Sequence, residues 1–330
     1  MSSGQITRIT RRSFCKQTVA TTLLAATAQV VAGEKKETEE TIDCHTHFYD
    51  PTRKEGVPWP HKKSSLYRTV LPQHLRAIKK PRAITGTVVV EASKWVEDNQ
   101  WLLGIAKDDP FIVGVVGNLK PGTEGFKKHL IRFAANPLYR GIRISQNLIR
   151  KQQQGSTTWR KDISLLIEKD LSLDVNGGST MAMTVAELAK KNPELRIVIN
   201  HISNVTIDGQ QPPADWAKGM RAAAKNKNVF CKVSALVEGA MRSDAVKKKG
   251  KAPNDLQFYK PTLDVVWDAF GDDRLIYGSN WPVCERAESY ATLQQLVIDY
   301  VTPKGKETLQ KFFAGNAKRV YKWIDRKNRL

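Results

Sequence analysis

Residues 41–47 read Thr-Ile-Asp-Cys-His-Thr-His, and this stretch decides how the rest of the chain is interpreted. It begins as an apolar strand and ends in two histidines. Because side chains alternate across a β-strand, Asp43, His45 and His47 are expected on the inward face and Cys44 on the face toward the helices. Two imidazoles at positions i and i+2 converge on one point, where they can bind a metal ion or polarise a carbonyl group.

Seven further apolar, β-branched runs follow this strand, separated by segments with helical periodicity. Repeated βα units require a parallel sheet. Eight units in about 250 residues favour a closed barrel over an open sheet. We therefore predict an α/β protein with one (β/α)8 TIM barrel. The predicted strands are Thr41–His47, Ile84–Glu91, Phe111–Asn118, Tyr139–Ile144, Leu171–Val175, Arg196–Asn200, Val229–Val233 and Leu275–Gly278.

The segments after the predicted strands are where a barrel of this kind carries its active site. Long loops are expected at Phe48–Leu71, Ser145–Trp159, Ile202–Trp216 and Ser234–Tyr259, where they would form the walls of a pocket. The last helical segments, Ser289–Tyr300 and Lys306–Trp323, are expected to close the outer ring.

The N-terminal residues indicate export. Arg11-Arg12 lies in a stretch that is similar to the twin-arginine export motif, and an uncharged segment from Thr18 to Ala32 follows. That segment is too short and too rich in threonine for a stable membrane span. We expect a signal segment at 1–32, a charged linker at 33–40 and the barrel at 41–326, in a periplasmic or extracellular protein.

The chain has a formal net charge of +20, from 53 Lys and Arg against 33 Asp and Glu. Such a balance raises the possibility of a nucleic-acid partner. The lysines are spread along the chain, however, and no nucleic-acid fold motif is present, so we predict a solvated basic surface and no nucleic-acid partner. Cys44, Cys231 and Cys284 form no C-x-x-C pair and are interpreted as buried structural thiols, the first two facing the helices.

Several motifs then connect this chain to a known family. Asp43-x-His45-x-His47, Gly141-Ile142-Arg143 and the run from Gly278 to Cys284 resemble the amidohydrolase-related family, in its sugar-lactonase-like branch, over Thr41 to Trp323. The resemblance implies a hydrolase that opens a lactone, ester or amide of a small, carbohydrate-like substrate. It also implies an Asp after the eighth strand that activates water. Some members use a divalent metal such as zinc or manganese, and others use none.

Candidate site residues follow from these positions. His201, after the sixth strand, is interpreted as a carbonyl polariser or metal-site partner beside His45 and His47. Glu91 ends the second strand and could activate water, with one of the paired histidines as its partner. Arg143 on the fourth strand could hold a carboxylate or sugar hydroxyls, or form an ion pair with Asp174.

Asn280 departs from the family, which has Asp at this position. An amide cannot act as a general base and binds metals weakly. Three explanations stay open: another base (Glu91 or His201), a metal site with unusual ligands, or a site that binds without turnover. Trp59 and Trp281 are candidates to stack on a sugar ring, and ordinary loop packing is the alternative for each of them. The leading hypothesis is lactone hydrolysis; the alternatives are a secreted binding protein and a metal-dependent decarboxylase.

Overall fold

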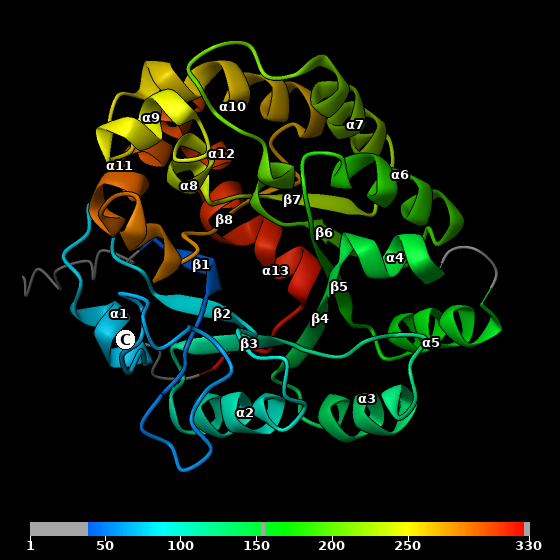
Figure 1. Ribbon diagram of the computed structural model, residues 1–330. Helices are drawn as coiled ribbons and strands as arrows, with labels where there is room; N and C mark the ends of the chain where they lie inside the picture. Colours follow the sequence, from blue (N-terminus) through cyan, green and yellow to red (C-terminus); the bar gives the residue numbers. More distant parts are fainter. Residues whose placement is uncertain (1–38, 153–155, 327–330) are drawn as a thin grey trace, which may run out of the picture. The chain divides into compact units, whose positions relative to one another are not determined.

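The computed structural model describes residues 39–152 and 156–326, in which eight parallel strands follow one another around a barrel (Figure 1). Strand β8 returns to β1, where the amide of His47 donates to the carbonyl of Trp281 at 2.9 Å. All eight predicted strands are confirmed, with bounds shifted by two residues at most. The strands are β1 (Ile42–Thr46), β2 (Gly86–Val90), β3 (Ile112–Gly117), β4 (Tyr139–Ser145), β5 (Ser172–Asn176), β6 (Ile197–Ile199), β7 (Val229–Val233) and β8 (Leu275–Tyr277).

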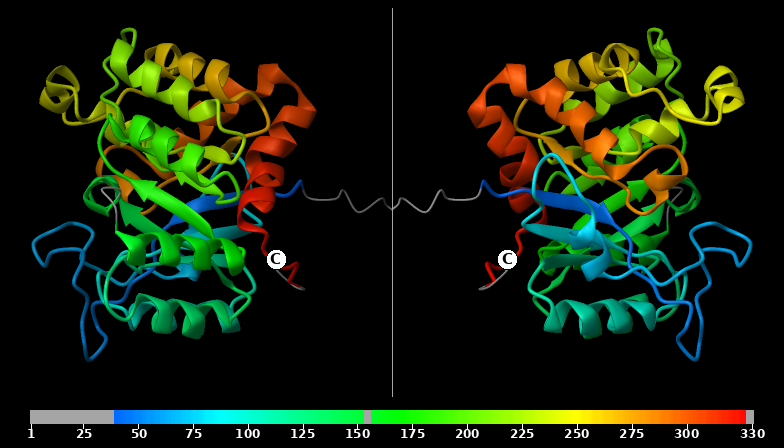
Figure 2. Two further views of the ribbon diagram at one scale, coloured as in Figure 1. Left: turned by 90° about the vertical axis from the view of Figure 1, so that its right-hand side faces the viewer. Right: turned by 90° about the vertical axis from the view of Figure 1, so that its left-hand side faces the viewer.

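Helices connect the strands and surround the barrel, as the three views of Figures 1 and 2 show. None of the helices in the described ranges is both long and apolar enough to span a membrane. The predicted signal segment and all but the last two residues of the linker lie outside the described residues. The helices are α1 (Pro72–Ala77), α2 (Asp98–Asp108), α3 (Phe126–Ala134), α4 (Gln146–Gln152), α5 (Thr157–Glu168), α6 (Met181–Lys191), α7 (Ala214–Ala224), α8 (Leu236–Ala240), α9 (Asp244–Lys249), α10 (Leu256–Phe270), α11 (Tyr290–Val301), α12 (Lys306–Gln310) and α13 (Asn316–Tyr321).

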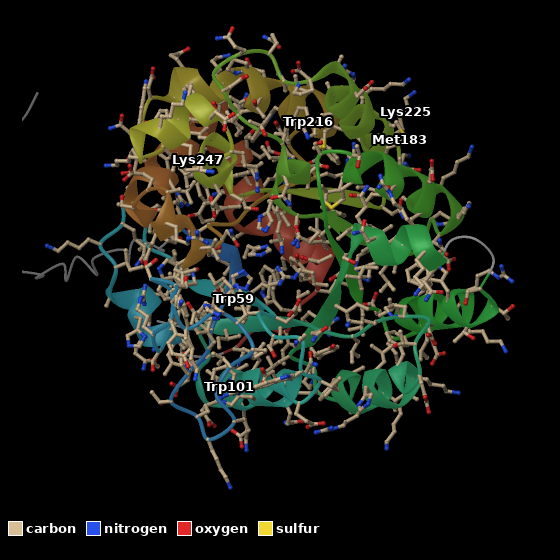
Figure 3. All side chains as sticks on the ribbon, viewed as in Figure 1. Trp59, Trp101, Met183, Trp216, Lys225 and Lys247 are labelled. Atoms are coloured by element: carbon tan, nitrogen blue, oxygen red, sulfur yellow. The ribbon has the colours of Figure 1, made fainter. Side chains whose placement is uncertain are left out.

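Two of the predicted loops contain short helices. The segment Ser145–Trp159 holds α4, and Ser234–Tyr259 holds α8 and α9. Five to seven residues make fewer than two helical turns, so these helices leave no periodic signal in the sequence. The lysines of α9 are exposed, and Figure 3 labels Lys247 among the outer helices.

The strands divide their side chains between the barrel interior and the surrounding helices. Ile42 and Cys44 join an interior cluster with residues from β2, β3, β6, β7 and β8, whereas Cys231 packs in the outer cluster with the helices. The expectation for Cys44 was therefore wrong. A register shift between Asp43 and Thr46 in the β1–β2 pairing breaks the simple alternation that the prediction assumed.

The same irregularity separates Asp43 from the two histidines. The Asp43 carboxylate is buried and accepts hydrogen bonds from the amide of Ser279 at 2.9 Å and the hydroxyl of Tyr290, on α11, at 3.1 Å. It thus joins β1 to β8 and α11. Asp43 was predicted to share an inward face with His45 and His47, and this part of the prediction is wrong.

Helix α13 covers the N-terminal end of the barrel instead of completing the outer ring. Val320 and Tyr321 belong to the interior cluster, and Figure 1 shows α13 at the centre of the strands. The guanidinium groups of Arg140 and Arg196 donate to the carbonyls of Tyr321 (2.8 Å) and Val320 (2.7 Å). These bonds satisfy carbonyls that a helix end leaves without partners.

Candidate active site

A pocket of about 330 Å³ opens at the carboxyl ends of the strands. Its volume is at the lower end of the range for small-molecule sites. The lining comes from nearly every strand end, as the architecture predicts. The lining residues are His47, Trp59, Ala92, Arg143, Asn176, His201, Asn204, Ala235, Glu238, Arg242, Asn280 and Val283.

The three predicted histidines cluster at this place. The ring of His45 lies 5.0 Å from that of His47 and 4.3 Å from that of His201, measured between centroids. His45 is fully buried, while the other two line the pocket. Gly278 allows β8 to approach closely, since a Cβ there would lie 2.9 Å from the Cβ of His45.

His47 has a defined proton position. Its Nδ1 lies 2.9 Å from the carbonyl oxygen of Val90, which can only accept, so Nδ1 carries the proton. The lone pair is then on Nε2, which lies 3.2 Å from Oδ1 of Asn280. Burial lowers the pKa of His47 to about 3, with the charge of Arg143 acting in the same direction. The ring is therefore neutral near pH 7.

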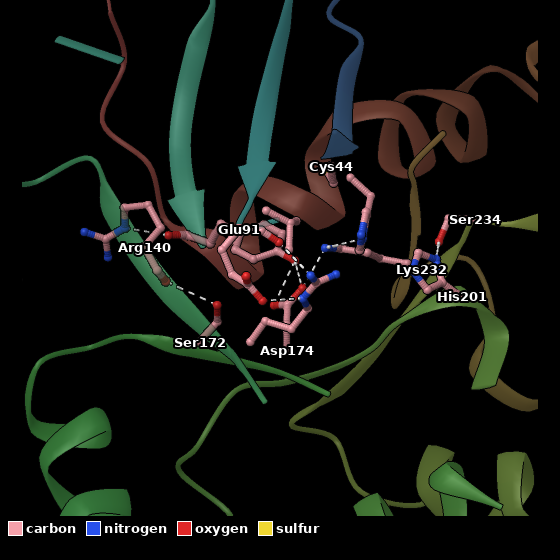
Figure 4. Close-up of polar contacts among 12 residues, drawn as sticks. Cys44, Glu91, Arg140, Ser172, Asp174, His201, Lys232 and Ser234 are labelled. Carbon is pink, nitrogen blue, oxygen red and sulfur yellow. Dashed lines mark hydrogen bonds and ion pairs between the residues drawn. The ribbon is translucent and has the colours of Figure 1, made fainter. Parts of the chain in front are cut away.

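A buried ion pair lies behind His45. Nζ of Lys232, on β7, is 2.6 Å from Oδ2 of Asp174, on β5, and both side chains are fully buried. The hydroxyl of Tyr321 donates to the same carboxylate at 3.0 Å. Figure 4 shows Lys232 between Asp174 and His201. Burial lowers the pKa of Lys232, and Asp174 opposes this effect and favours the charged ammonium.

Lys232 also determines the proton position of His45. Its Nζ lies 3.3 Å from Nδ1 of His45. An ammonium group can only donate, so Nδ1 must accept and the proton of the neutral ring is on Nε2. That Nε2 is buried and has no hydrogen-bond partner within the described part of the chain. An oxygen acceptor brought to this atom would gain a hydrogen bond that the protein does not supply.

His201 lies in an unusual turn. It and the next three residues all have positive φ, between 43° and 59°. Such conformations cost non-glycine residues about 1–3 kcal/mol each and must be held by their surroundings. Here Nε1 of Trp216 donates to the carbonyl of Ile202 at 2.9 Å, and Arg242 donates to Oδ1 of Asn204 at 2.6 Å. The turn directs Nδ1 of His201 to Oγ of Ser234, at 2.9 Å (Figure 4).

Left-handed backbone also recurs elsewhere in the pocket wall. Ala235 follows β7 with φ 53°, and Asn280 follows β8 with φ 61°. Both line the pocket together with His201 and Asn204. Strained backbone of this kind concentrates at functional sites. Its recurrence around one pocket supports a site that is preorganised by the fold.

Glu91 and Arg143 form an ion pair with each other. Nε of Arg143 donates to Oε1 of Glu91 at 3.0 Å, and Nη2 donates to its backbone carbonyl at 2.6 Å. Burial raises the pKa of Glu91, and Arg143 counteracts this rise. Glu91 does not line the central pocket, whereas Arg143 does. The carboxylate therefore orients Arg143. The sequence had suggested His45 or His47 as the partner of Glu91, and Asp174 as the partner of Arg143; the structure pairs Glu91 with Arg143 instead.

Asn280 connects His47 to a carboxyl group that sequence analysis missed. Its Nδ2 donates to Oε1 of Glu238, on α8, at 2.7 Å. Burial raises the pKa of Glu238 to about 7, although the Asn280 hydrogen bond lowers it. A carboxyl group thus lies one hydrogen bond away from the position where the family resemblance expects one.

The two predicted tryptophans differ in position. Trp59 lines the pocket, with its ring 5.8 Å from that of His47 (Figure 3 labels it). Trp281 does not line it: the indole is 1% exposed, and its Nε1 donates to Glu285 at 2.7 Å. Packing against Phe48 explains this burial. The position of Trp281 does not support the predicted stacking on a substrate.

The arrangement fits a metal ion poorly. No group of three or more His, Cys, Asp or Glu side chains in residues 39–152 and 156–326 has a geometry that could hold one. His45 has its proton on Nε2, whereas a metal ligand needs a nitrogen with a free lone pair, and the Lys232 charge nearby repels a cation. The positive charge beside the histidines comes from the ammonium group of Lys232.

Comparisons with known proteins show the family. A family model described as amidohydrolase matches residues 42–323. The chain belongs to the amidohydrolase family. As a member it is an enzyme of the hydrolase class, as the sequence predicted.

Individual relatives of this amidohydrolase cover nearly the same residues. An L-fucono-1,5-lactonase of Burkholderia ambifaria is 29% identical over 86% of this chain and 96% of its own length. An amidohydrolase from Burkholderia multivorans, solved with bound zinc, is 24% identical with a TM-score of 0.73, over 86% of this chain and 100% of that one. A probable 2-pyrone-4,6-dicarboxylic acid hydrolase from Acinetobacter baumannii is 15% identical with a TM-score of 0.65, over 86% and 100%. These two solved structures support the fold.

The residues missed by sequence analysis share one property: they lie on elements whose signal was ambiguous. Lys232 lies on the same face of β7 as Phe230, and a charged residue in an apolar strand could have indicated an inward cation. Glu238 and Arg242 lie in or beside the short helix α8, within a segment expected to be irregular. No sequence signal distinguished them from other charged loop residues.

Proposed function

We propose that this amidohydrolase hydrolyses the lactone of a sugar acid. The relatives named lactonases support the substrate class, and the pocket volume of about 330 Å³ suits a monosaccharide-sized ring. One observation carries the proposal: buried Lys232 holds His45 with its proton on an Nε2 that has no partner among the described residues, beside His47 and His201.

Such a proton is suited to a lactone carbonyl. When water attacks the carbonyl carbon, negative charge develops on the carbonyl oxygen. A hydrogen-bond donor aimed at this oxygen in a dry site lowers the barrier, and removing one such donor typically costs about 10²–10³ in rate. His45 has the protonated nitrogen, and Lys232 behind it strengthens that donor electrostatically. His201, whose pKa is also lowered by burial, completes a neutral imidazole pair at the base of the pocket.

The wall of the pocket offers groups for the rest of the sugar. Arg143 is oriented by Glu91, and amide side chains are present at Asn176 and Asn204. These donors and acceptors match ring hydroxyls. Trp59 contributes an indole face at the pocket wall, where a sugar ring can stack.

The site gives no specific support to the alternatives. A metal-dependent decarboxylase would need a ligand set that the described residues do not form. A binding protein without turnover was suggested by Asn280, but Glu238 brings a carboxyl group to that same place. Neither alternative accounts for the protonated nitrogen of buried His45.

A panel of sugar lactones, including L-fucono-1,5-lactone and L-rhamnono-gamma-lactone, tests the proposal. Hydrolysis is followed by acid release with a pH indicator, on protein dialysed against a chelator. We expect turnover of at least one aldonolactone, and loss of it in His45→Gln. Turnover of none of the lactones, or equal rates in His45→Gln, would contradict the proposal.

A further inference from the structure

The side chain of Glu238 lies where a group could activate water, and one of its carboxylate oxygens has no hydrogen-bond partner among the described residues. Glu238 lies on α8, which directly follows the carboxyl end of β7, and it lines the pocket. Its Oε1 accepts from Asn280 at 2.7 Å. Its Oε2 is buried and has no hydrogen-bond partner among the described residues. A carboxylate oxygen without a partner is costly when buried and is therefore a strong proton acceptor.

We propose that Glu238 is the general base of this hydrolase and that Asn280 positions it. The inference rests on the lactone hydrolysis proposed above. It explains the departure at position 280: the carboxylate that the family resemblance expects there is supplied from α8, and the amide connects it to His47.

The proposed step balances without any other reactant. The Glu238 carboxylate takes a proton from water as the water oxygen bonds to the lactone carbonyl carbon, and the carbonyl electron pair moves to the oxygen that faces Nε2 of His45. When that pair returns, the bond between the carbonyl carbon and the ring oxygen breaks. Glu238 returns its proton to this ring oxygen, which becomes a hydroxyl. The product is the open-chain hydroxy acid, and Glu238 is again a carboxylate.

The other candidate bases are less suited to this step. The Glu91 carboxylate is paired with Arg143, and Glu91 lies outside the pocket lining. Burial lowers the pKa of His47 to about 3 and lowers that of His201 strongly, so both are weak bases near neutrality. General bases work best with a pKa close to the working pH. The pKa of Glu238, raised to about 7 by burial, meets this condition.

The orientation of the Asn280 amide agrees with a carboxyl group that changes its protonation. With Nδ2 toward Glu238, the amide donates to an ionised carboxylate. The reverse orientation fits the neutral acid, which then donates to Oδ1 while Nδ2 donates to the lone pair of His47 Nε2. In the ionised state Oδ1 of Asn280 faces the lone pair of His47, so the amide bonds only to Glu238, whereas the neutral acid allows both hydrogen bonds. This arrangement favours a proton on Glu238 and agrees with its raised pKa.

The charged and titratable groups around Glu238 come from four other places. Arg242 after α8 and Arg286 on η2 (Val283–Arg286) favour the carboxylate, and burial outweighs them. The neutral thiol of Cys284 and hydroxyl of Tyr259, whose pKa values are raised chiefly by burial, and the neutral ring of His47 complete the set. None of these three groups titrates close to pH 7, so a change near this pH reports on Glu238.

The first test is Glu238→Gln, which keeps the acceptor for Asn280 but removes the base. Glu187→Gln, an exposed position on α6, is the matched control. We expect kcat on the best lactone to fall by about 10²–10⁴. KM and the melting temperature should stay close to those of the wild type, and the control should keep full activity. A kcat within about threefold of the wild type would overturn the inference.

A carboxyl exchange guards against a merely structural effect. The double variant Glu238→Gln/Asn280→Asp moves the carboxylate by one hydrogen bond, to the position where the family resemblance expects it. We expect at least a tenfold recovery over Glu238→Gln. Recovery supports a need for a carboxylate at this place, whereas a double variant that folds normally but stays as slow as Glu238→Gln argues against it.

The pH dependence completes the test and separates this inference from the proposed function. A base must be deprotonated, so kcat/KM of the wild type should fall about tenfold per pH unit below pH 7, and this limb should be absent in Glu238→Gln. Infrared difference spectra of wild type against Glu238→Gln need no substrate. A carboxyl band that disappears with a midpoint near pH 7 supports the inference even if no lactone is hydrolysed. A midpoint below pH 5 overturns it even if lactones are hydrolysed.

Discussion

Replacing Lys232 by Met should separate the stability of the barrel from its chemistry. The ammonium and the Asp174 carboxylate are 2.6 Å apart and both fully buried. Within residues 39–152 and 156–326, the variant therefore leaves this carboxylate with the Tyr321 hydroxyl as its one hydrogen-bond partner. Removing one partner of a buried pair typically costs about 3–5 kcal/mol. This is a large part of the total stability of a protein of this kind, which is about 5–15 kcal/mol.

The double variant Lys232→Met/Asp174→Asn removes both charges at once. Replacing a whole buried pair by neutral groups is often close to neutral for stability, so most of the lost free energy of unfolding should return. Activity should not return, because Nδ1 of His45 no longer faces a cation and the proton of the ring is free to move to it. Stability and turnover should therefore respond differently to the second substitution.

Urea unfolding monitored by tryptophan fluorescence gives the free energies, and nitrogen NMR of labelled histidine gives the proton position of His45. In the wild type we expect the signal of a neutral ring with its proton on Nε2, and in both variants a shift toward Nδ1. A loss below about 1 kcal/mol in Lys232→Met would contradict a charged buried pair. An unchanged His45 signal would refute the role of Lys232.

Three further outcomes are expected. His45→Gln should lower kcat/KM on the best lactone by about 10²–10³, as loss of an oxyanion donor does, with little change in melting temperature; a loss below tenfold would show that His45 is not that donor. Elemental analysis should find no stoichiometric zinc or manganese, and chelation should leave the rate unchanged; one ion per chain that disappears in His45→Ala/His47→Ala would reverse our interpretation of these histidines. The double variant Arg11→Lys/Arg12→Lys should stay in the cytoplasm of a bacterium that exports the wild type, and cell fractionation measures this. Equal export of the variant and the wild type would argue against a twin-arginine signal.

The strands were predictable because a parallel barrel buries them on both faces, which produces continuous apolar runs with clear ends. The positions of His47 and His201 followed, since strand ends locate the pocket. The orientation of Asp43 did not follow, because a single register irregularity in β1 changes which side chains point inward and leaves no mark in the composition. Glu238 was hidden by a helix too short for periodicity.

Partners were harder to predict than positions. Glu91, Arg143, Asp174 and Lys232 form two ion pairs, and the sequence alone allowed several other pairings among these residues and the histidines. Which pair forms depends on the relative heights of β2, β4, β5 and β7 in the barrel. Those heights are set by the stagger of the strands, a property of the whole sheet.

The hydroxyl of Tyr321, on the last helix, touches the carboxylate that holds Lys232. The candidate pocket at one end of the barrel therefore depends on a helix that covers the other end. Without this helix the Asp174 carboxylate loses a hydrogen bond, and Lys232 is held less firmly beside His45. A truncation just before α13 should therefore abolish activity although every residue that lines the pocket is still present.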